Sequence, residues 1–203
     1  MKSSCYDVYK SMAELVETCE QRFGSLYGKK VLDISCHDGK LLSLFQKKGA
    51  ATIGIGPNCE FSNVEKKSFV VFNGKVSKYM VEAIASSYEN VDFITATSYV
   101  DNIDEVFSLL KKIIVSETVV VIENHYLGPV LNEGQFDIFY GEFPRTYRYA
   151  SILQIARICE ATFIDVEFPA HFGGNIRVFL WNEASSSIVG KSIGTTDYSL
   201  RFY

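Results

Sequence analysis

One segment near the N-terminus limits the fold of this chain more than any other. It reads Val31-Leu-Asp-Ile-Ser-Cys-His-Asp-Gly39, and the amphipathic run Lys40-Leu-Leu-Ser-Leu-Phe45 follows it directly. The order is an apolar strand, a polar turn that contains glycine, and a helix. This order places backbone N–H groups and a helix N-terminus at the carboxyl edge of a sheet. Open α/β sheets bind nucleotide-like ligands at that edge.

Apolar and amphipathic runs alternate along the rest of the chain. Apolar positions at helical spacing over residues 7–23 predict a leading helix that packs beside the sheet. Strands are expected at 30–34, 51–55, 68–72, 91–96, 117–123, 162–168 and 175–181. Further helices are expected at 38–48, 75–87, 103–114 and 148–160. This order predicts an α/β, Rossmann-like fold with a doubly wound, seven-stranded, mostly parallel sheet whose last strand is antiparallel.

Length and composition limit the kind of protein. The 203 residues suit one domain, expected to span 1–183, followed by a tail at 184–203 that is at first rich in Ser, Gly and Thr. The formal net charge of −4 gives no sign of a basic face for nucleic acid. No apolar run approaches the roughly 20 residues of a membrane helix. The N-terminus lacks the apolar core of a signal peptide, so a cytoplasmic location is expected.

The cysteines indicate neither a disulfide framework nor a metal site. The chain has five of them, scattered and without any CxxC pair. This spacing suits reduced thiols in the core or at the surface. No metal is therefore expected.

Three further segments carry patterns of their own. They are Glu123-Asn-His-Tyr-Leu-Gly128, Gln135-Phe-Asp-Ile-Phe-Tyr-Gly-Glu-Phe-Pro-Arg-Thr-Tyr147 and His171-Phe-Gly-Gly-Asn-Ile-Arg177. With Val31–Gly39, and in this order and spacing, they resemble S-adenosylmethionine-dependent C-methyltransferases, the group that includes nucleotide-sugar C-methyltransferases. The likeness covers roughly residues 28–182. It implies the class I methyltransferase fold, S-adenosyl-L-methionine as cofactor and a small-molecule acceptor such as a nucleotide-linked sugar.

The chain departs from the pattern of that family at several places, and one of them is the additional Phe172 between His171 and the glycines. The family's YHEH becomes Tyr140-Gly-Glu-Phe143, so both histidines are absent, including the one usually assigned as general base. The acidic residue that ends the second strand and holds the ribose hydroxyls is replaced by Gly56. The glycine of the cofactor loop is Ser35.

The resemblance assigns the cofactor to the ends of the first, second and fourth strands. Asp33 could fix loop amides or meet the amino group of the methionine half, and a buried, loop-organising Asp is the structural alternative. Asp38 is expected to cap the next helix and also to contact the ligand. The expected cofactor residues are Asp33, Ser35, His37, Asp38, Gly39, Gly56, Pro57, Thr95, Ala96 and Thr97.

Methylation of a carbon nucleophile requires a base within hydrogen-bonding reach of the proton that it removes. The candidates are Glu142, His125, Tyr140 and His171. Glu142 is favoured as base or orienting group because it keeps the acidic position of the family motif. For each candidate, a structural role in a loop remains the alternative.

The resemblance also names residues for the acceptor. Arginine suits bidentate contact with phosphate or carboxylate groups, and ordinary surface ion pairs are the alternative for each arginine. The expected substrate residues are Asn124, Tyr126, Arg145, Tyr147, Gly173, Gly174, Asn175 and Arg177.

The leading hypothesis is a methyltransferase that uses S-adenosylmethionine and acts on a small molecule, for example a nucleotide-linked sugar. Loss of the histidine pair also admits an oxygen or nitrogen acceptor, which demands less of a base. The alternative is a catalytically silent methyltransferase-fold protein that serves as a binding or assembly module. A nicotinamide-dependent dehydrogenase is disfavoured because the first loop has no G-x-G-x-x-G. The acidic balance disfavours RNA methylation, and the oligomeric state stays open.

Overall fold

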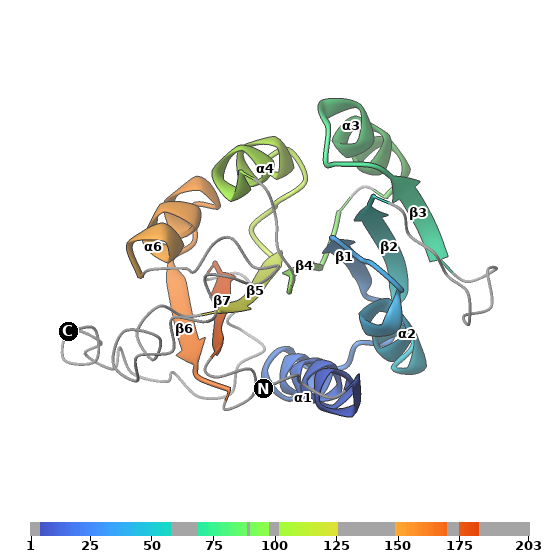
Figure 1. Cartoon of the computed structure of the whole chain (residues 1–203). Coiled ribbons are helices and arrows are strands. Elements are labelled where there is room, and N and C mark those ends of the chain that lie inside the picture. The colour runs from blue at the N-terminus through green and yellow to red at the C-terminus, as the bar shows by residue number, and fades with distance from the viewer. Residues whose placement is uncertain are drawn as a thin grey trace.

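The computed structural model describes residues 5–57, 69–88, 90–97, 102–125, 149–169 and 175–182 (Figure 1). The strands are β1 Lys30–Ile34, β2 Ala51–Gly56, β3 Phe69–Asn73, β4 Phe93–Ala96, β5 Val119–His125, β6 Phe163–Glu167 and β7 Asn175–Trp181. The helices are α1 Cys5–Phe23, α2 Lys40–Lys47, α3 Lys78–Ser87, α4 Ile103–Leu110 and α6 Tyr149–Ile158. None of the described helices is long and apolar enough to cross a membrane.

The strands form one sheet in the order β3-β2-β1-β4-β5-β7-β6. β1 to β5 run parallel to one another, and β7 is antiparallel to both of its neighbours, β5 and β6. This arrangement confirms the predicted doubly wound, mostly parallel sheet of seven strands with an antiparallel last strand. The apolar run Val119–Ile122 of β5 is buried on both faces, as its β-branched composition predicts for a central strand.

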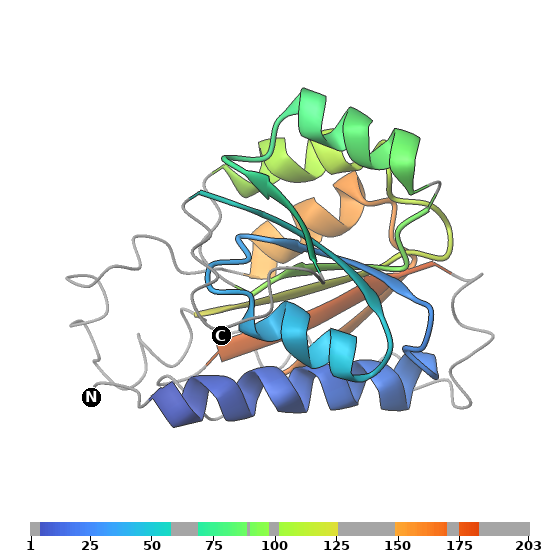
Figure 2. The ribbon, with the colours of Figure 1, turned by 90° about the vertical axis from the view of Figure 1, so that its right-hand side faces the viewer.

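Helices cover both faces of the sheet. Figures 1 and 2 show α1 and α2 on one face and α3, α4 and α6 on the other. Each face carries its own apolar core: Leu32 and Ile34 of β1 belong to the cluster on the α3–α4–α6 side, and Val31 belongs to the cluster on the α1–α2 side. Successive side chains of a strand point to opposite faces, so this alternation fixes which residues meet which helices.

The leading helix α1 packs along the face of the sheet, as its apolar spacing predicts. It begins at Cys5, two residues before the predicted start, and ends at the predicted Phe23. Its Leu15, Val16 and Cys19 are fully or almost fully buried. The Phe23 ring meets Phe93 of β4 edge-on, with the ring centroids 5.9 Å apart. α1 is therefore an integral layer of the core.

Two other helices differ from the predicted ranges at one end. α3 begins at Lys78 instead of 75 because Ser77 is its N-cap, and the Ser77 hydroxyl oxygen accepts the Met80 N–H at 3.4 Å. α4 ends at Leu110 instead of 114 because the next residues tighten into turns, in which the Ile113 N–H donates to the Leu110 carbonyl at 2.8 Å. The predicted domain limit of 1–183 stays a prediction, and residues 183–203 lie outside the described part.

The face under α1 and α2 changes character along its strands. Toward the amino ends of β1 and β4 it presents Val31 and Phe93, which are buried and apolar. Two residues further along the same strands and on the same face, it presents Asp33 and Thr95, which are buried and polar. In β5, Glu123 follows the apolar Val121 in the same way. Buried polar groups thus gather at the carboxyl edge of the sheet, where ligands of open α/β sheets bind.

Candidate active site

The loop after β1 has a tightly wound backbone. Ser35, His37 and Gly39 have positive φ values of 75°, 42° and 73°, although only the last of them is glycine. The amides of Ser35 and Cys36 both donate to the carbonyl of Ile55 in β2, at 2.7 and 3.0 Å. The loop is thereby tied to β2 and turns the chain directly into α2.

The N-terminus of α2 lies at the carboxyl edge because of this turn. Gly39 is its N-cap, in the left-handed conformation. Asp38 therefore stands one residue before the N-cap, and its carboxylate accepts the N–H of Lys40 at 3.2 Å. The predicted capping by Asp38 is thus corrected in position: the carboxylate satisfies one amide of the first turn from outside the helix. Helix N-termini carry partial positive charge and favour bound anions.

Close packing holds the loop against β2. A Cβ atom added to Gly54 would lie 2.7 Å from the sulfur of Cys36 and 3.0 Å from a methyl group of Leu42, so only glycine fits there. Cys36 is buried in this contact, which favours a structural thiol. Burial also raises the pKa of the Cys19 and Cys159 thiols to about 12, so both are protonated at neutral pH.

Asp33 lies beneath this loop and is bound by a hydroxyl group of the neighbouring strand. The residue is 3% exposed, and the hydroxyl of Thr95 donates to its Oδ1 at 2.8 Å. Burial raises the pKa of the Asp33 carboxyl from its ordinary value to about 7, and the hydrogen bond from Thr95 acts in the opposite direction. Among the described residues, no basic side chain forms an ion pair with it. Asp33 is therefore a buried carboxyl group that would gain from a cationic ligand.

The ends of β2 and β4 complete this half of the edge. β2 ends at Gly56, whose carbonyl accepts the N–H of Gly74 at 3.0 Å, and Pro57 follows. No carboxylate stands at Gly56, in keeping with the departure seen in the sequence, and residues 58–68 lie outside the described part. Ala96 is buried and Thr97 is half-buried beyond Thr95. The structure thus brings the expected cofactor residues together on β1, β2, β4 and the loop before α2.

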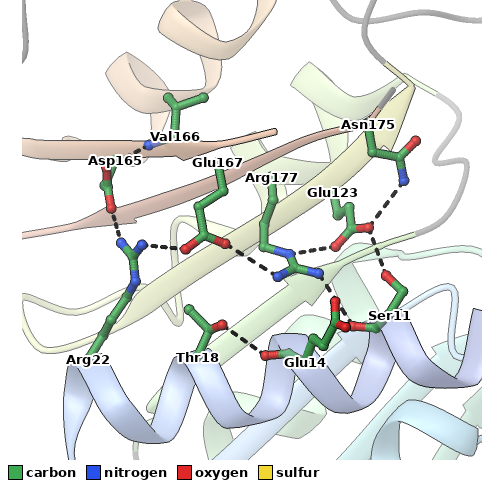
Figure 3. A network of polar contacts seen from close by, with 10 residues as sticks. All are labelled: Ser11, Glu14, Thr18, Arg22, Glu123, Asp165, Val166, Glu167, Asn175 and Arg177. Atoms are coloured by element: carbon green, nitrogen blue, oxygen red, sulfur yellow. Dashed lines mark hydrogen bonds and ion pairs between the residues drawn. The ribbon is translucent and has the colours of Figure 1, made fainter. Parts of the chain in front are cut away.

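The ends of β5 and β7 form the second half of the edge. Glu123 pairs in register with Arg177, and His125 pairs with Asn175. The Glu123 carboxylate accepts hydrogen bonds from Arg177 Nε at 2.6 Å, Asn175 Nδ2 at 3.1 Å and the Ser11 hydroxyl at 3.2 Å. Figure 3 shows these groups converging between the sheet and α1.

Arg177 is fully engaged in this network. The residue is 3% exposed, and its Nη1 and Nη2 donate to Glu167 of β6 and to the Ser11 carbonyl, both at 3.3 Å. With Nε bound to Glu123, each guanidinium nitrogen has a protein partner. This placement argues against the predicted contact of Arg177 with a substrate anion, because the guanidinium would first have to leave a buried ion pair.

A second arginine extends the network and was missed from the sequence. Arg22 in the last turn of α1 forms ion pairs with Asp165 and Glu167 of β6, and its guanidinium lies 4.7 Å from the centroid of the Phe179 ring. The available signal was a charged residue among apolar positions of α1, opposite alternating acids on β6. Arg22 thus fixes how α1 packs against the sheet, and it contributes no group to the edge where ligands bind.

Several expected residues fall outside the described part of the chain. Residues 126–148 and 170–174 are such ranges, and they hold Tyr126, Tyr140, Glu142, Arg145, Tyr147, His171, Gly173 and Gly174. His125 is the last residue of β5. Asn124 is buried on the face opposite Glu123, so it does not join the network under α1. The catalytic assignments therefore stay predictions.

The fold and the edge define a class of protein. A family model described as a methyltransferase domain matches residues 6–162, and the chain belongs to this family. Enzymes of this class use S-adenosylmethionine as cofactor.

Individual relatives agree with this family. The chain is 22% identical over 181 residues to the C-methyltransferase NovU of Streptomyces niveus, and the match covers 87% of this chain and 43% of that protein. The chain thus spans less than half the length of this relative.

Solved structures share the fold. A SAM-dependent methyltransferase from Archaeoglobus fulgidus superposes with a TM-score of 0.60 at 16% identity, over 87% of this chain and 99% of that one. Magnesium protoporphyrin IX methyltransferase from Synechocystis PCC 6803, with bound SAH, gives 0.61 at 12% identity, over 90% and 89%. At such identities the likeness establishes the fold.

Proposed function

We propose that the protein binds S-adenosylmethionine at the ends of β1, β2 and β4 and transfers its methyl group to a small molecule at the ends of β5 and β7. The observation that carries this proposal is the buried Asp33, which has no basic partner among the described residues and lies in β1, the strand that ends at the loop before α2. The carboxyl edge of the sheet thus offers a carboxylate for a cation and a helix N-terminus for an anion.

These two groups suit an amino-acid moiety. The α-carboxylate of a methionine half would face the N-terminus of α2, and its ammonium group would face Asp33. When bound, the cofactor supplies an electrophilic methyl group on a sulfonium. Asp33 and the loop around Ser35 would hold this half in place, and transfer to an aligned nucleophile then needs little further chemistry.

The fit is incomplete on the ribose side. β2 ends at Gly56, so the carboxylate that usually receives the ribose hydroxyls is absent at this position. The methionine half therefore has its partners among the described residues, and the ribose half lacks its usual one. We expect binding to depend more on Asp33 than it would in a site with a ribose carboxylate.

A nucleotide-linked sugar is the proposed acceptor class, on the basis of the sequence motifs. The relative named C-methyltransferase NovU supports a carbon acceptor. With both histidines of the motif absent, Glu142 is the proposed base, and His125, Tyr140 and His171 are the alternatives. An oxygen or nitrogen acceptor would make a weaker base sufficient.

Calorimetric titration with S-adenosylmethionine, and separately with S-adenosylhomocysteine, tests the cofactor site. We expect micromolar dissociation constants that Asp33→Asn and Asp33→Ala raise at least tenfold. Asp104→Ala, which removes an exposed carboxylate from α4, is the matched control and should leave binding unchanged. Absence of binding up to millimolar ligand, with the protein folded by circular dichroism, would refute the proposal.

The second candidate is a catalytically silent binding or assembly module. The missing carboxylate at Gly56 favours it, together with the missing histidines. Release of S-adenosylhomocysteine in a screen of nucleotide sugars separates the two: turnover by the wild type, but not by Glu142→Gln, supports the enzyme. Cofactor binding without turnover of any acceptor supports the silent module.

A further inference from the structure

At the β5–β7 end, one buried acceptor atom has no hydrogen-bond partner among the residues that the structure describes. Asn175 is 7% exposed, and its Nδ2 donates to Glu123. Its Oδ1 is also buried, yet within the described part of the chain it accepts no hydrogen bond. A buried polar atom without a partner costs about 1–3 kcal/mol, so such an atom calls for an explanation.

Glu123 fixes the direction of this oxygen. An ionised carboxylate only accepts hydrogen bonds, so the amide of Asn175 must turn its nitrogen toward Glu123 and its oxygen away. Figure 3 shows this orientation. Glu123 is itself held by Arg177 at 2.6 Å and by Ser11 of α1 at 3.2 Å. The amide therefore cannot rotate by 180° without placing oxygen against oxygen.

Asn175 Oδ1 lies at the carboxyl edge of the sheet, but away from the residues expected to hold the cofactor. Asp33, Thr95 and Val121 form one row across β1, β4 and β5, and Asn175 pairs with His125, four residues beyond that row. At about 3.3 Å per residue and about 4.8 Å per strand, Asn175 stands roughly 13 Å further along the strands and three strands away from β1. A group at this distance suits the acceptor molecule.

The chemistry of the site selects a donor. An amide oxygen accepts, and the carboxylate of Glu123 beside it makes the local potential negative, so a phosphate or carboxylate would be repelled. We propose that Asn175 Oδ1 receives a hydrogen bond from a hydroxyl group of the methyl acceptor, with Glu123 as the residue that positions it. This inference rests on the proposed function and adds to it a hydroxyl-bearing hexose unit at the ends of β5 and β7.

UDP-glucose and UDP are the probes, because they share the nucleotide and differ in the hexose on the terminal phosphate. The extra charge on the terminal phosphate of UDP cancels when the ratio of their affinities is compared between the wild type and a variant. Their affinities are measured by calorimetry in the presence of saturating S-adenosylhomocysteine. We expect the wild type to bind UDP-glucose at least tenfold more tightly than UDP. Asn175→Leu should reduce this ratio to about twofold and leave the affinities for UDP and S-adenosylhomocysteine unchanged. Asn182→Leu, one residue beyond the opposite end of β7, is the matched control and should keep the wild-type ratio.

The variants of Glu123 separate positioning from simple support of the fold. The side-chain amide introduced by Glu123→Gln could itself donate to Asn175 Oδ1. This substitution therefore releases the Asn175 amide to either orientation and should lower the UDP-glucose to UDP ratio. A purely structural role would instead weaken UDP, UDP-glucose and S-adenosylhomocysteine alike. Asn175→Leu leaves the Glu123–Arg177 pair intact, so the test does not depend on the folding of the Glu123 variant.

Two results would overturn the inference. One is a wild type that binds UDP-glucose no better than UDP, and the other is Asn175→Leu with an unchanged ratio. In either case, retained binding of S-adenosylhomocysteine would leave the proposed function standing. Failure of the wild type to bind S-adenosylhomocysteine would refute the proposed function and this inference together.

Discussion

The buried Glu123–Arg177 pair should dominate the effect of mutations on the stability of this protein. Only 4% of the Arg177 side chain and 6% of the Glu123 side chain are exposed. Arg177→Met removes this cation from the Glu123 carboxylate, while the neutral donors of Ser11 and Asn175 stay in place. Removing one partner of a buried ion pair typically costs about 3–5 kcal/mol. Since whole domains are stable by about 5–15 kcal/mol, this loss is a large fraction.

Removal of the other partner of the pair should cost less stability. Glu123→Leu leaves Arg177 with Glu167 at 3.3 Å and the Ser11 carbonyl, so the guanidinium keeps an anionic partner that is 29% exposed. Replacing both members by apolar residues of similar size is often neutral, so the double variant should recover most of the stability lost by Arg177→Met. The pair should therefore show a coupling energy of about 2 kcal/mol or more.

Urea unfolding of the four proteins measures this cycle. The free energy of unfolding is extrapolated to water for the wild type, both single variants and the double variant. Lys112→Met breaks the exposed pair with Glu82 and serves as the control, for which no measurable loss is expected. The reasoning is refuted if Arg177→Met costs less than about 1 kcal/mol, or if the two single losses simply add in the double variant.

Four further predictions concern the cofactor edge. Because the pKa of Asp33 is about 7, the folded state keeps a proton on this carboxyl that the unfolded state releases near pH 4. The free energy of unfolding should therefore fall between pH 4 and pH 7 by up to about 1.4 kcal/mol per pH unit. Urea titrations at several pH values should show this slope for the wild type and a flatter one for Asp33→Asn. The ammonium group of S-adenosylhomocysteine should displace that proton from Asp33, so this ligand should bind more tightly as the pH rises to 7. Calorimetry in buffers of different ionisation enthalpy should detect the proton that is released on binding. Ser35→Gly should stabilise by roughly 0.5–1 kcal/mol, because Ser35 has a φ of 75°, and an unchanged urea midpoint would contradict this. Gly54→Ala should destabilise by about 1–3 kcal/mol and weaken cofactor binding, because its Cβ would lie 2.7 Å from the Cys36 sulfur; unchanged affinity would show that the loop geometry does not matter for binding.

The sequence predicted the order of elements well because the signals for them are local. Alternating apolar runs located each strand of the sheet, and the strand–turn–helix pattern placed Asp33 and Gly39 at the carboxyl edge. The finer geometry of the loop was not visible, because the left-handed conformation of Ser35 and His37 depends on contacts with β2. The shift of the cap from Asp38 to Gly39 follows from the same turn.

The acceptor half was harder to predict because its contacts join distant parts of the chain. Arg177 was expected to bind a substrate anion, and in the fold it meets Glu123, 54 residues away, and Ser11, 166 residues away. These contacts exist because β7 inserts between β5 and β6 and because α1 covers all three. Neither relation can be obtained from residue types or local spacing, so a buried structural arginine resembled a binding one.

This reassignment changes what the edge can recognise. Asp33 on one side, and Glu123 with Asn175 on the other, offer acceptor atoms only, and the guanidinium of Arg177 is occupied within the network. The ends of β5 and β7 therefore suit a hydroxyl-bearing acceptor and would repel phosphate, whereas the N-terminus of α2 at the cofactor end favours an anion. If the acceptor carries a nucleotide diphosphate, its phosphates require a cation from residues 126–148, where Arg145 is the predicted candidate. The sugar and the phosphates of such a substrate would then be held by separate parts of the chain.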